Sequence, residues 1–321
     1  MITSYVIGLL LLIEILMSGA RLGVDALSMN YYAMSCPFVE MIVRNVVNEA
    51  LRQDPTVAPG LLRLHFHDCF VQGCDGSVLI DSTKDNTAEK DSPANLSLHG
   101  FEIIDRAKLM IERQCPGVVS CADILALAAR EAVLFTGGPL YDVATGRKDG
   151  RRSKIEDTIN LPAPFFNTTT LINMFGQHGF DVQELVALAG AHTLGAARCS
   201  SFKHRLSKFD SSHDVDPTLN SNLAMMMSRT CIQGDNASMP LDWTPNSFDN
   251  VYFNALQMGM GLLFSDQALT TDPQTQGLVN FFAMNQDMFF FNFQRAMVKM
   301  GLLDVKEGDE GEIRLYCHKV N

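Results

Sequence analysis

The stretch from Arg63 to Ser77, RLHFHDCFVQGCDGS, combines residues that could transfer protons with residues that could bind a cation. If its first part is helical, Arg63, Phe66 and His67 share one face, because they are three and four residues apart. That face carries a cation, an aromatic wall and a titratable base. Asp68 points about a quarter-turn away from it, toward the segment that follows.

The segment after this helix is rich in oxygen ligands. Asp68, Asp75 and the Ser77 hydroxyl, with carbonyls of the turn between Cys69 and Cys74, form a set made of oxygen atoms alone. Hard cations such as calcium take such ligands. The pattern therefore predicts a calcium site directly after the helix.

Two other interpretations of the same stretch stay open from the residues alone. His65, His67, Cys69 and Cys74 could hold zinc, but zinc requires thiolates, which an oxidising compartment converts to a disulfide. The stretch could also be a packed helix whose histidines have no chemical role.

A second candidate histidine, His192, ends an apolar segment, LVALAGAHTLG, on the stripe of Leu185, Leu188 and Ala189. Residues 189–191 are small, so that a large flat group could approach closely. A single histidine on an apolar face is usually a packed core residue, but here the face of Arg63 could close the opposite side. One histidine as axial ligand, with a histidine and an arginine opposite, is the arrangement that haem peroxide chemistry needs.

The elements that position these residues are predicted to be helices, and the fold class is all-α. The 321 residues are 47% hydrophobic and 19% charged, which is enough for a large core. Apolar residues recur at helical spacing in 36–55, 181–192 and 248–263. Ser120 and Asp123 have the spacing of a capping box at the start of 120–138. Short strands are expected only near 141–145.

The net charge of −11 and the isoelectric point near 5.1 argue against nucleic acid as a partner. Residues 1–26 contain an apolar run followed by small residues, which predicts a secretory signal peptide cleaved near Ala20 to Ala26. A membrane anchor in the mature form is not expected, because Glu14 interrupts the short run.

Eight cysteines after a signal peptide predict four disulfides. Their pairing is open, with 105 combinations possible, and only Cys69 with Cys74 is favoured by proximity. Sequons at Asn167 and Asn236 predict a glycoprotein, and a third sequon begins at Asn95.

Separated motifs along residues 27–321 resemble the class III secretory plant haem peroxidases. They include RLHFHDCFVQGCDGSVL, AEKDSPANLSLHGF, CPGVVSCADILALAAR, NLPAP, VALAGAHTLG, FDNVYF and LLFSDQAL, in this order. The resemblance implies one haem peroxidase domain over 27–321, with a two-lobed, mainly helical fold and haem b between the lobes.

The resemblance also implies the roles of five residues. His192 is the proximal iron ligand, and Asp266 accepts its other ring N–H. His67 is the distal acid–base group and Arg63 the distal cation. Asn95 holds the remaining N–H of His67, so it should be buried and free of glycan despite its sequon.

The implied reaction reduces hydrogen peroxide to water and oxidises small phenolic donors in one-electron steps. His67 takes a proton from one peroxide oxygen and returns it to the departing one, while Arg63 stabilises the charge that develops. Pro162 matches the family's donor-contact position, and Phe165 and Phe166 are candidate aromatic contacts.

Two calcium ions are implied as further cofactors. The distal ligands are Asp68, the Val71 and Gly73 carbonyls, Asp75, Ser77 and, through water, Glu89. The proximal ligands are Thr193, Asp242, Thr244, the Ser247 carbonyl and Asp249. Asp242 and Thr244 stand one residue closer together than the family spacing, and an ordinary turn on Thr-Pro-Asn is the alternative for that segment.

The implied disulfides are Cys36–Cys115, Cys69–Cys74, Cys121–Cys317 and Cys199–Cys231. We expect a monomer in the cell wall or apoplast, and a vacuolar location is less favoured because the sequence ends at Asn321 without a further tail.

Two other functions would need fewer of these residues. A haem or oxygen carrier needs no distal base and arginine. A structural protein without catalysis needs none of the five residues that the resemblance assigns to the reaction.

Overall fold

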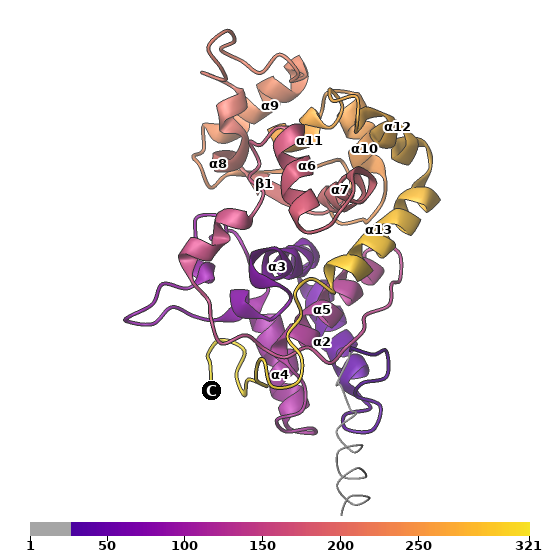
Figure 1. Cartoon of the computed structure of the whole chain (residues 1–321). Helices are drawn as coiled ribbons and strands as arrows, with labels where there is room; N and C mark the ends of the chain where they lie inside the picture. Colours follow the sequence, from indigo (N-terminus) through magenta and orange to yellow (C-terminus); the bar gives the residue numbers. More distant parts are fainter. Residues whose placement is uncertain (1–26) are drawn as a thin grey trace, which may run out of the picture.

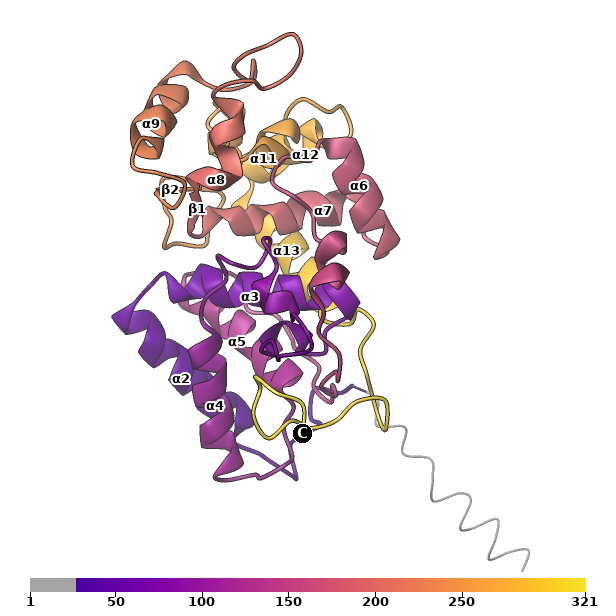
Figure 2. The ribbon, with the colours of Figure 1, turned by 90° about the vertical axis from the view of Figure 1, so that its left-hand side faces the viewer.

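The computed structural model describes residues 27–321, and the predicted signal peptide lies outside the described residues. The chain folds into two mainly helical lobes (Figures 1 and 2), as predicted. The first lobe contains α2 (Val39–Gln53), α3 (Val57–Gln72), α4 (Phe101–Glu112) and α5 (Cys121–Phe135). No helix within 27–321 is both long enough and apolar enough to cross a membrane.

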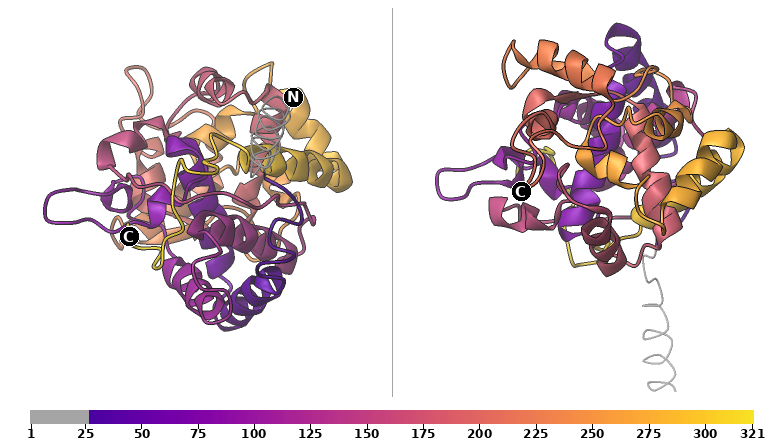
Figure 3. Two further views of the ribbon diagram at one scale, coloured as in Figure 1. Left: turned by 60° about the horizontal axis from the view of Figure 1, so that its bottom comes forward. Right: turned by 90° about the horizontal axis from the view of Figure 1, so that it is seen from above.

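The second lobe contains shorter helices. They are α6 (Thr168–Gln177), α7 (Val182–Ala189), α8 (Cys199–Phe202), α9 (Ser221–Cys231), α10 (Val251–Gln257), α11 (Phe264–Ala268) and α12 (Gln276–Met284). The long helix α13 (Gln286–Met300) then runs back toward the first lobe, and the C-terminal end lies beside that lobe (Figures 1 and 3).

Single 3₁₀ turns connect several of these helices. They are η1 (Ser77–Leu79), η2 (Glu89–Asp91), η3 (Ile155–Asn160), η4 (Gly190–Thr193) and η5 (Lys203–Arg205). Two short strands, β1 (Ala196–Arg198) and β2 (Ser238–Pro240), pair antiparallel, with Ala197 opposite Met239.

The prediction of a strand near 141–145 is wrong. Thr145 makes one isolated bridge with Ser28, and residues 141–144 have no strand partner. A strand needs a paired neighbour to satisfy its backbone groups. Here the Ala144 carbonyl instead accepts a hydrogen bond from the guanidinium of Arg147 at 2.6 Å.

The helices of the first lobe follow the predicted apolar pattern. The buried residues of α2 are Val39, Ile42, Val43, Val46, Val47, Ala50 and Leu51, which is the predicted face. α5 begins as predicted, since the Ser120 hydroxyl accepts a hydrogen bond from the backbone N–H of Asp123 at 3.1 Å. Both α2 and α3 pack against α5, whose residues 121–133 are all buried.

Helix α3 is the element that joins the two lobes. On one side it packs against α5. On the other, Phe66 and Phe70 contact Phe175 and Phe180 of the second lobe, with the Phe70 and Phe175 rings 4.9 Å apart. Because α3 is enclosed on both sides, even His65, His67 and Asp68 are buried.

Near the start of α3, Pro59 packs against Gly195. A Cβ atom built on Gly195 would lie 2.7 Å from the Cβ of Pro59, and Gly195 has a φ of +89°. Only glycine meets both requirements without strain. This contact, at the opposite end of α3 from the phenylalanine cluster, fixes the distance between α3 and the segment that carries His192.

The four disulfides are those that the resemblance implied: Cys36–Cys115, Cys69–Cys74, Cys121–Cys317 and Cys199–Cys231. The Cys69–Cys74 bond removes both thiolates that a zinc site would need, so the zinc interpretation is wrong. Cys121–Cys317 holds the C-terminal segment against the start of α5, which is why the chain ends beside the first lobe.

We predict that Gly195→Ala destabilises the protein more than Gly179→Ala. Gly179 also has a positive φ, of +79°, but open space around it, so its substitution costs only the backbone strain of about 1–2 kcal/mol. At Gly195 the contact with Pro59 should add about 1–3 kcal/mol. Denaturant unfolding of both variants measures the difference, and equal losses would show that Pro59 does not constrain this segment.

Candidate active site

His67 and Arg63 form one wall of the candidate site, on the face of α3 that the spacing predicted. The Arg63 Nε donates a hydrogen bond to the His67 Nε2 at 3.1 Å. The other ring nitrogen of His67, Nδ1, lies 2.6 Å from the Asn95 Oδ1. The amide Nδ2 of Asn95 donates to the Glu89 carbonyl at 2.8 Å, so the Oδ1 faces His67. Nδ1 therefore carries the proton and Nε2 presents a lone pair.

The position of Arg63 is fixed by the segment after η2. Its guanidinium donates to the Ser97 hydroxyl at 2.7 Å and to the Ala94 carbonyl at 2.9 Å. Ser97 was not among the predicted residues, although it belongs to the sequon that drew attention to Asn95. These contacts hold the guanidinium beside His67.

Burial keeps His67 neutral. Burial, and then the charge of Arg63, lower the pKa of His67 to about 3, although the hydrogen bond to Asn95 raises it slightly. Burial and then the charge of Arg198 lower the pKa of Arg63 to about 10. At neutral pH the site thus holds a neutral base beside a cation.

His192 lies in η4, the 3₁₀ turn that continues α7, and its Nδ1 is 2.8 Å from the Asp266 Oδ1. Burial lowers the pKa of His192, but the charge and hydrogen bond of Asp266 outweigh it, so the pKa is raised. Tyr252 donates to the same Asp266 oxygen at 3.1 Å. Tyr252 was missed from the sequence, although it lies in the FDNVYF motif.

Gly190, one of the small residues before His192, packs against α13 and so does not face the space for a flat group. A Cβ atom on Gly190 would lie 2.4 Å from the ring of Phe289 on α13. Gly190 is therefore small because α13 packs closely against it. Ala189 and Ala191 remain partly exposed beside His192.

We call the space between these two walls, at the boundary between the lobes, the cleft. The charge of Arg63 acts on the pKa of His192, so these side chains lie within electrostatic reach of each other. The His192 side chain is 41% exposed and Arg63 is exposed, yet the pKa of each responds to burial. Side chains that contact solvent although many protein atoms surround them are typical of the walls of a cleft.

This cleft fits haem by its donor groups. With the Nδ1 of His192 engaged by Asp266, the Nε2 has no hydrogen-bond partner among the described residues, and imidazole is a common axial ligand of haem iron. The opposite wall carries the lone pair of His67 and the guanidinium of Arg63.

The predicted distal calcium ligands cluster after α3. Asp68 accepts hydrogen bonds from the N–H groups of Gly76 and Val78, at 2.9 and 3.4 Å. The Ser77 hydroxyl and both carboxylate oxygens of Glu89 are buried without a hydrogen-bond partner among the described residues. Buried oxygens are normally satisfied, so these fit a bound cation.

The pKa shifts in this cluster also fit a bound cation. Burial, and then the nearby charge of Asp75, raises the pKa of Asp68 to about 8. Burial, and then Asp68, raises the pKa of Glu89 to about 8. A divalent cation would stabilise the ionised carboxylates. Val71 lies in the last turn of α3, and Gly73 follows its end.

The structure also gathers the predicted proximal ligands. The Thr193 hydroxyl lies 2.7 Å from the Asp242 Oδ2 and 3.1 Å from the Asp249 Oδ1. The Thr244 hydroxyl lies 3.1 Å from the same Asp249 oxygen. Asp242 is thus brought to the cluster despite its shortened spacing, and Ser247 follows in the same turn, where its N–H donates to the Thr244 carbonyl at 2.8 Å.

No group of three or more His, Cys, Asp or Glu side chains in residues 27–321 is arranged to hold a metal ion. Both predicted calcium sets rely partly on hydroxyl and carbonyl oxygens.

The predicted donor contacts lie in the segment between η3 and α6. Phe165 is 58% exposed, and its ring contacts Phe166 at 5.2 Å. Pro162 is partly exposed. The Pro164 carbonyl accepts a hydrogen bond from Ser265 at 3.0 Å, so this segment is held beside the helix that carries Asp266.

Comparison with known proteins identifies the family. The model of the family described as "Peroxidase" matches residues 43–285. The chain is 60% identical to Peroxidase 47 of Arabidopsis thaliana over 321 residues, 100% of this chain and 97% of that protein. It is 50% identical to Peroxidase 64 of the same plant, with 92% and 94% covered, and 48% identical to Peroxidase 5 of Vitis vinifera, with 92% of each covered.

The fold and these matches define a peroxidase. The chain belongs to the plant class III peroxidases. Membership in this family implies haem. The four disulfides of the chain agree with passage through the secretory pathway.

We predict that Asn95 carries no glycan although it heads a sequon. Asn95 is 2% exposed and both ends of its amide are hydrogen-bonded, whereas Asn236 is exposed. Peptide mapping by mass spectrometry of protein secreted from plant cells should find Asn95 unmodified. A glycan at Asn95 would show that it does not hold His67, and modification of Asn236 in the same sample would show that the cells glycosylate this chain.

Proposed function

We propose that this peroxidase is a secreted enzyme that reduces hydrogen peroxide to water while oxidising small phenolic donors in one-electron steps. The observation that carries the proposal is a pair of histidines. His67 is neutral and its Nε2 accepts a hydrogen bond from Arg63, whereas His192 is half-exposed and its Nδ1 is held by Asp266. A haem or oxygen carrier, or a structural protein, has no use for the first pair.

His192 would hold haem b through its Nε2. Asp266 keeps the proton of His192 on Nδ1 and gives the imidazole anionic character. Haem, when bound, supplies the redox chemistry that links peroxide reduction to donor oxidation.

His67 would move the proton of the reaction. Its neutral Nε2 accepts the proton of one peroxide oxygen, and the same nitrogen returns it to the oxygen that departs as water. The hydrogen bond from Nδ1 to Asn95 holds the ring in the tautomer that this requires. Arg63 remains charged at neutral pH and stabilises the negative charge that develops as the O–O bond breaks.

Phenolic donors would bind near Pro162, Phe165 and Phe166. The exposed ring of Phe165 offers an aromatic contact to a small phenol. We further propose two calcium ions at the clusters already described, a monomeric state, and a location in the cell wall or apoplast. The catalytic domain would comprise residues 27–321.

The test is a visible spectrum of the purified protein. Ferric haem should be present, its Soret band should shift when hydrogen peroxide is added, and a phenolic donor should restore the band. A panel of monolignols, flavonoids and auxin, measured with excess peroxide, would then rank donors. Haem without a response to peroxide would support a carrier, and protein that binds no haem would support a structural role.

We predict that His67→Ala slows the reaction with peroxide by about 10²–10⁴-fold, the usual contribution of a positioned acid–base group, while haem stays bound. Stopped-flow measurement of the Soret change gives the rate. His213→Ala is the control, since His213 is exposed and pairs with Asp210 in a surface loop. Equal rates for the two variants would remove His67 from the reaction.

We predict that Asp266→Asn raises the reduction potential of the bound iron. The carboxylate favours the more oxidised iron by making His192 more electron-rich, and an amide cannot do so. Tyr252→Phe removes only the second hydrogen bond to Asp266, so its effect should be smaller and in the opposite direction. Spectroelectrochemical titration measures both variants, and an unchanged potential in Asp266→Asn would contradict this role.

A further inference from the structure

We propose that Lys306 balances the charge of the distal calcium site, so that it stabilises the site without calcium and weakens calcium binding. The inference rests on the calcium site proposed above. Lys306 belongs to the C-terminal segment, and neither the resemblance nor the proposed ligand set includes it.

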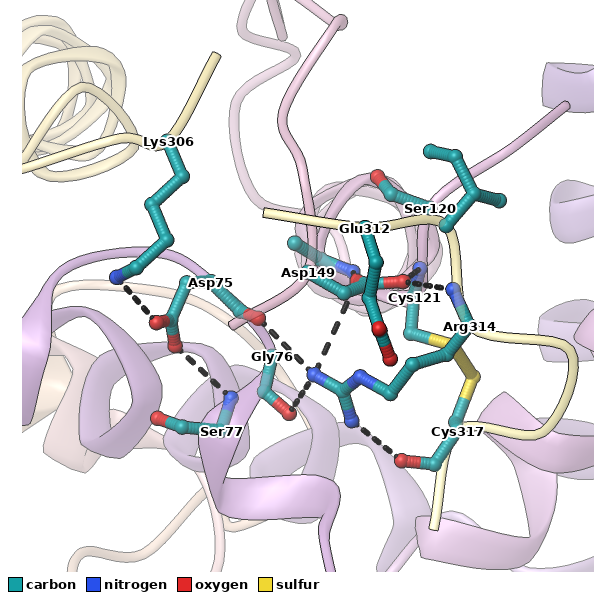
Figure 4. Close-up of polar contacts among 12 residues, drawn as sticks. Asp75, Gly76, Ser77, Ser120, Cys121, Asp149, Lys306, Glu312, Arg314 and Cys317 are labelled. Atoms are coloured by element: carbon teal, nitrogen blue, oxygen red, sulfur yellow. Dashed lines mark hydrogen bonds and ion pairs between the residues drawn. A yellow bond between two sulfur atoms is a disulfide. The ribbon is translucent and has the colours of Figure 1, made fainter. Parts of the chain in front are cut away.

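Lys306 contacts a calcium ligand directly. Its Nζ lies 2.5 Å from the Asp75 Oδ2, while the other oxygen of Asp75 accepts from the Ser77 N–H at 3.0 Å. Figure 4 shows the lysine reaching Asp75 from the C-terminal segment. The Asp75 side chain is 2% exposed and that of Lys306 is 27% exposed, so the pair is shielded from solvent on the side of the carboxylate.

The backbone around Lys306 is held close to the site. The Lys306 carbonyl accepts from the Lys148 N–H at 2.8 Å, and the Cys74 N–H donates to the Leu303 carbonyl at 3.0 Å. A Cβ on Gly73 would lie 2.4 Å from the Asp304 carbonyl oxygen. The C-terminal segment therefore packs directly on the calcium-binding loop, and the ammonium group is delivered by a fixed backbone.

The charges around the site explain why a lysine is there. Asp68, Asp75 and Glu89 carry three negative charges when ionised, and they lie close enough that the charge of Asp75 raises the pKa of both Asp68 and Glu89. One ammonium leaves two negative charges, and one calcium ion compensates these. With both cations the buried site is neutral, which is the state that a low-dielectric interior favours.

Arg314 acts on the site less directly than Lys306: its charge lowers the pKa of Asp68, but its guanidinium is bonded to no carboxylate of the site. Its guanidinium donates to the backbone carbonyls of Asp75, Gly76 and Cys317 (Figure 4). Its charge also lies 3.9 Å from the buried carboxylate of Asp149. The guanidinium thus holds the loop and pairs with Asp149, whereas the Lys306 ammonium is bonded to a carboxylate of the site.

Two opposite consequences follow from one positive charge. Without calcium, the ammonium pairs with the buried carboxylate of Asp75 and compensates its charge. With calcium, the same ammonium repels the divalent ion across a short distance. Lys306 should therefore make the apo site more stable and the calcium-bound site less tight.

The experiment compares Lys306→Met, Lys306→Arg and the wild-type protein, each loaded with haem. Calcium is removed with a chelator and titrated back, with competition against a calcium dye giving an affinity for each of the two sites. Thermal unfolding is recorded with and without calcium. Lys299→Met is the matched control, because it removes a lysine that pairs with Glu184 at 2.6 Å, outside both calcium sets.

We expect Lys306→Met to bind one of its two calcium ions about tenfold more tightly or better, and to lose thermal stability mainly in the absence of calcium. Lys306→Arg should resemble the wild type, and Lys299→Met should leave both calcium affinities unchanged. Equal or weaker calcium binding by Lys306→Met would overturn the inference, even where the wild type binds two ions and is an active peroxidase. A wild type that binds no calcium would remove the proposed site and the inference with it, without affecting the assignments of His67 and His192.

Discussion

The structure depends on the burial of helix α3 between the two lobes. One face of α3 presents Arg63 and His67 to the cleft, and the adjacent residue, Asp68, enters the distal cluster of oxygens. Glu89 belongs to both, since its carbonyl holds Asn95 and its carboxylate lies in the cluster. The orientation of the base and the state of the cluster are therefore coupled through a few bonds. A change in the cluster would therefore affect the tautomer of His67 first.

The second lobe repeats this arrangement with different residues. His192 is followed at once by Thr193, whose hydroxyl contacts Asp242 and Asp249. In each lobe a histidine of the cleft is thus next in sequence to a member of an oxygen cluster. The contact between Pro59 and Gly195 then sets the separation of the two histidine-bearing segments, so that the cleft has a fixed width.

Local sequence patterns predicted what depends on neighbours in the chain. The apolar face of α2, the cap of α5 and the shared face of Arg63 and His67 all follow from helical spacing. Apart from Cys69–Cys74, which proximity favoured, the disulfide pairs came from the resemblance alone, because spacing allows many pairings. Contacts between distant segments were missed: Lys306 and Asp75 are 231 residues apart. Nothing in the sequence around Lys306 indicates that a fixed backbone carries it to a calcium-binding loop.

The two oxygen clusters differ in how they are stabilised without a metal ion, and the difference is electrostatic. The distal cluster has an ammonium group bonded to Asp75. In the proximal cluster the acidic side chains are bonded by the Thr193 and Thr244 hydroxyls, which carry no charge, and burial raises the pKa of Asp242. Neutral donors stabilise a buried carboxylate less than a cation does. The proximal cluster should therefore depend more on a bound calcium ion. Because Thr193 adjoins His192, the proposed iron ligand lies beside the more dependent of the two clusters.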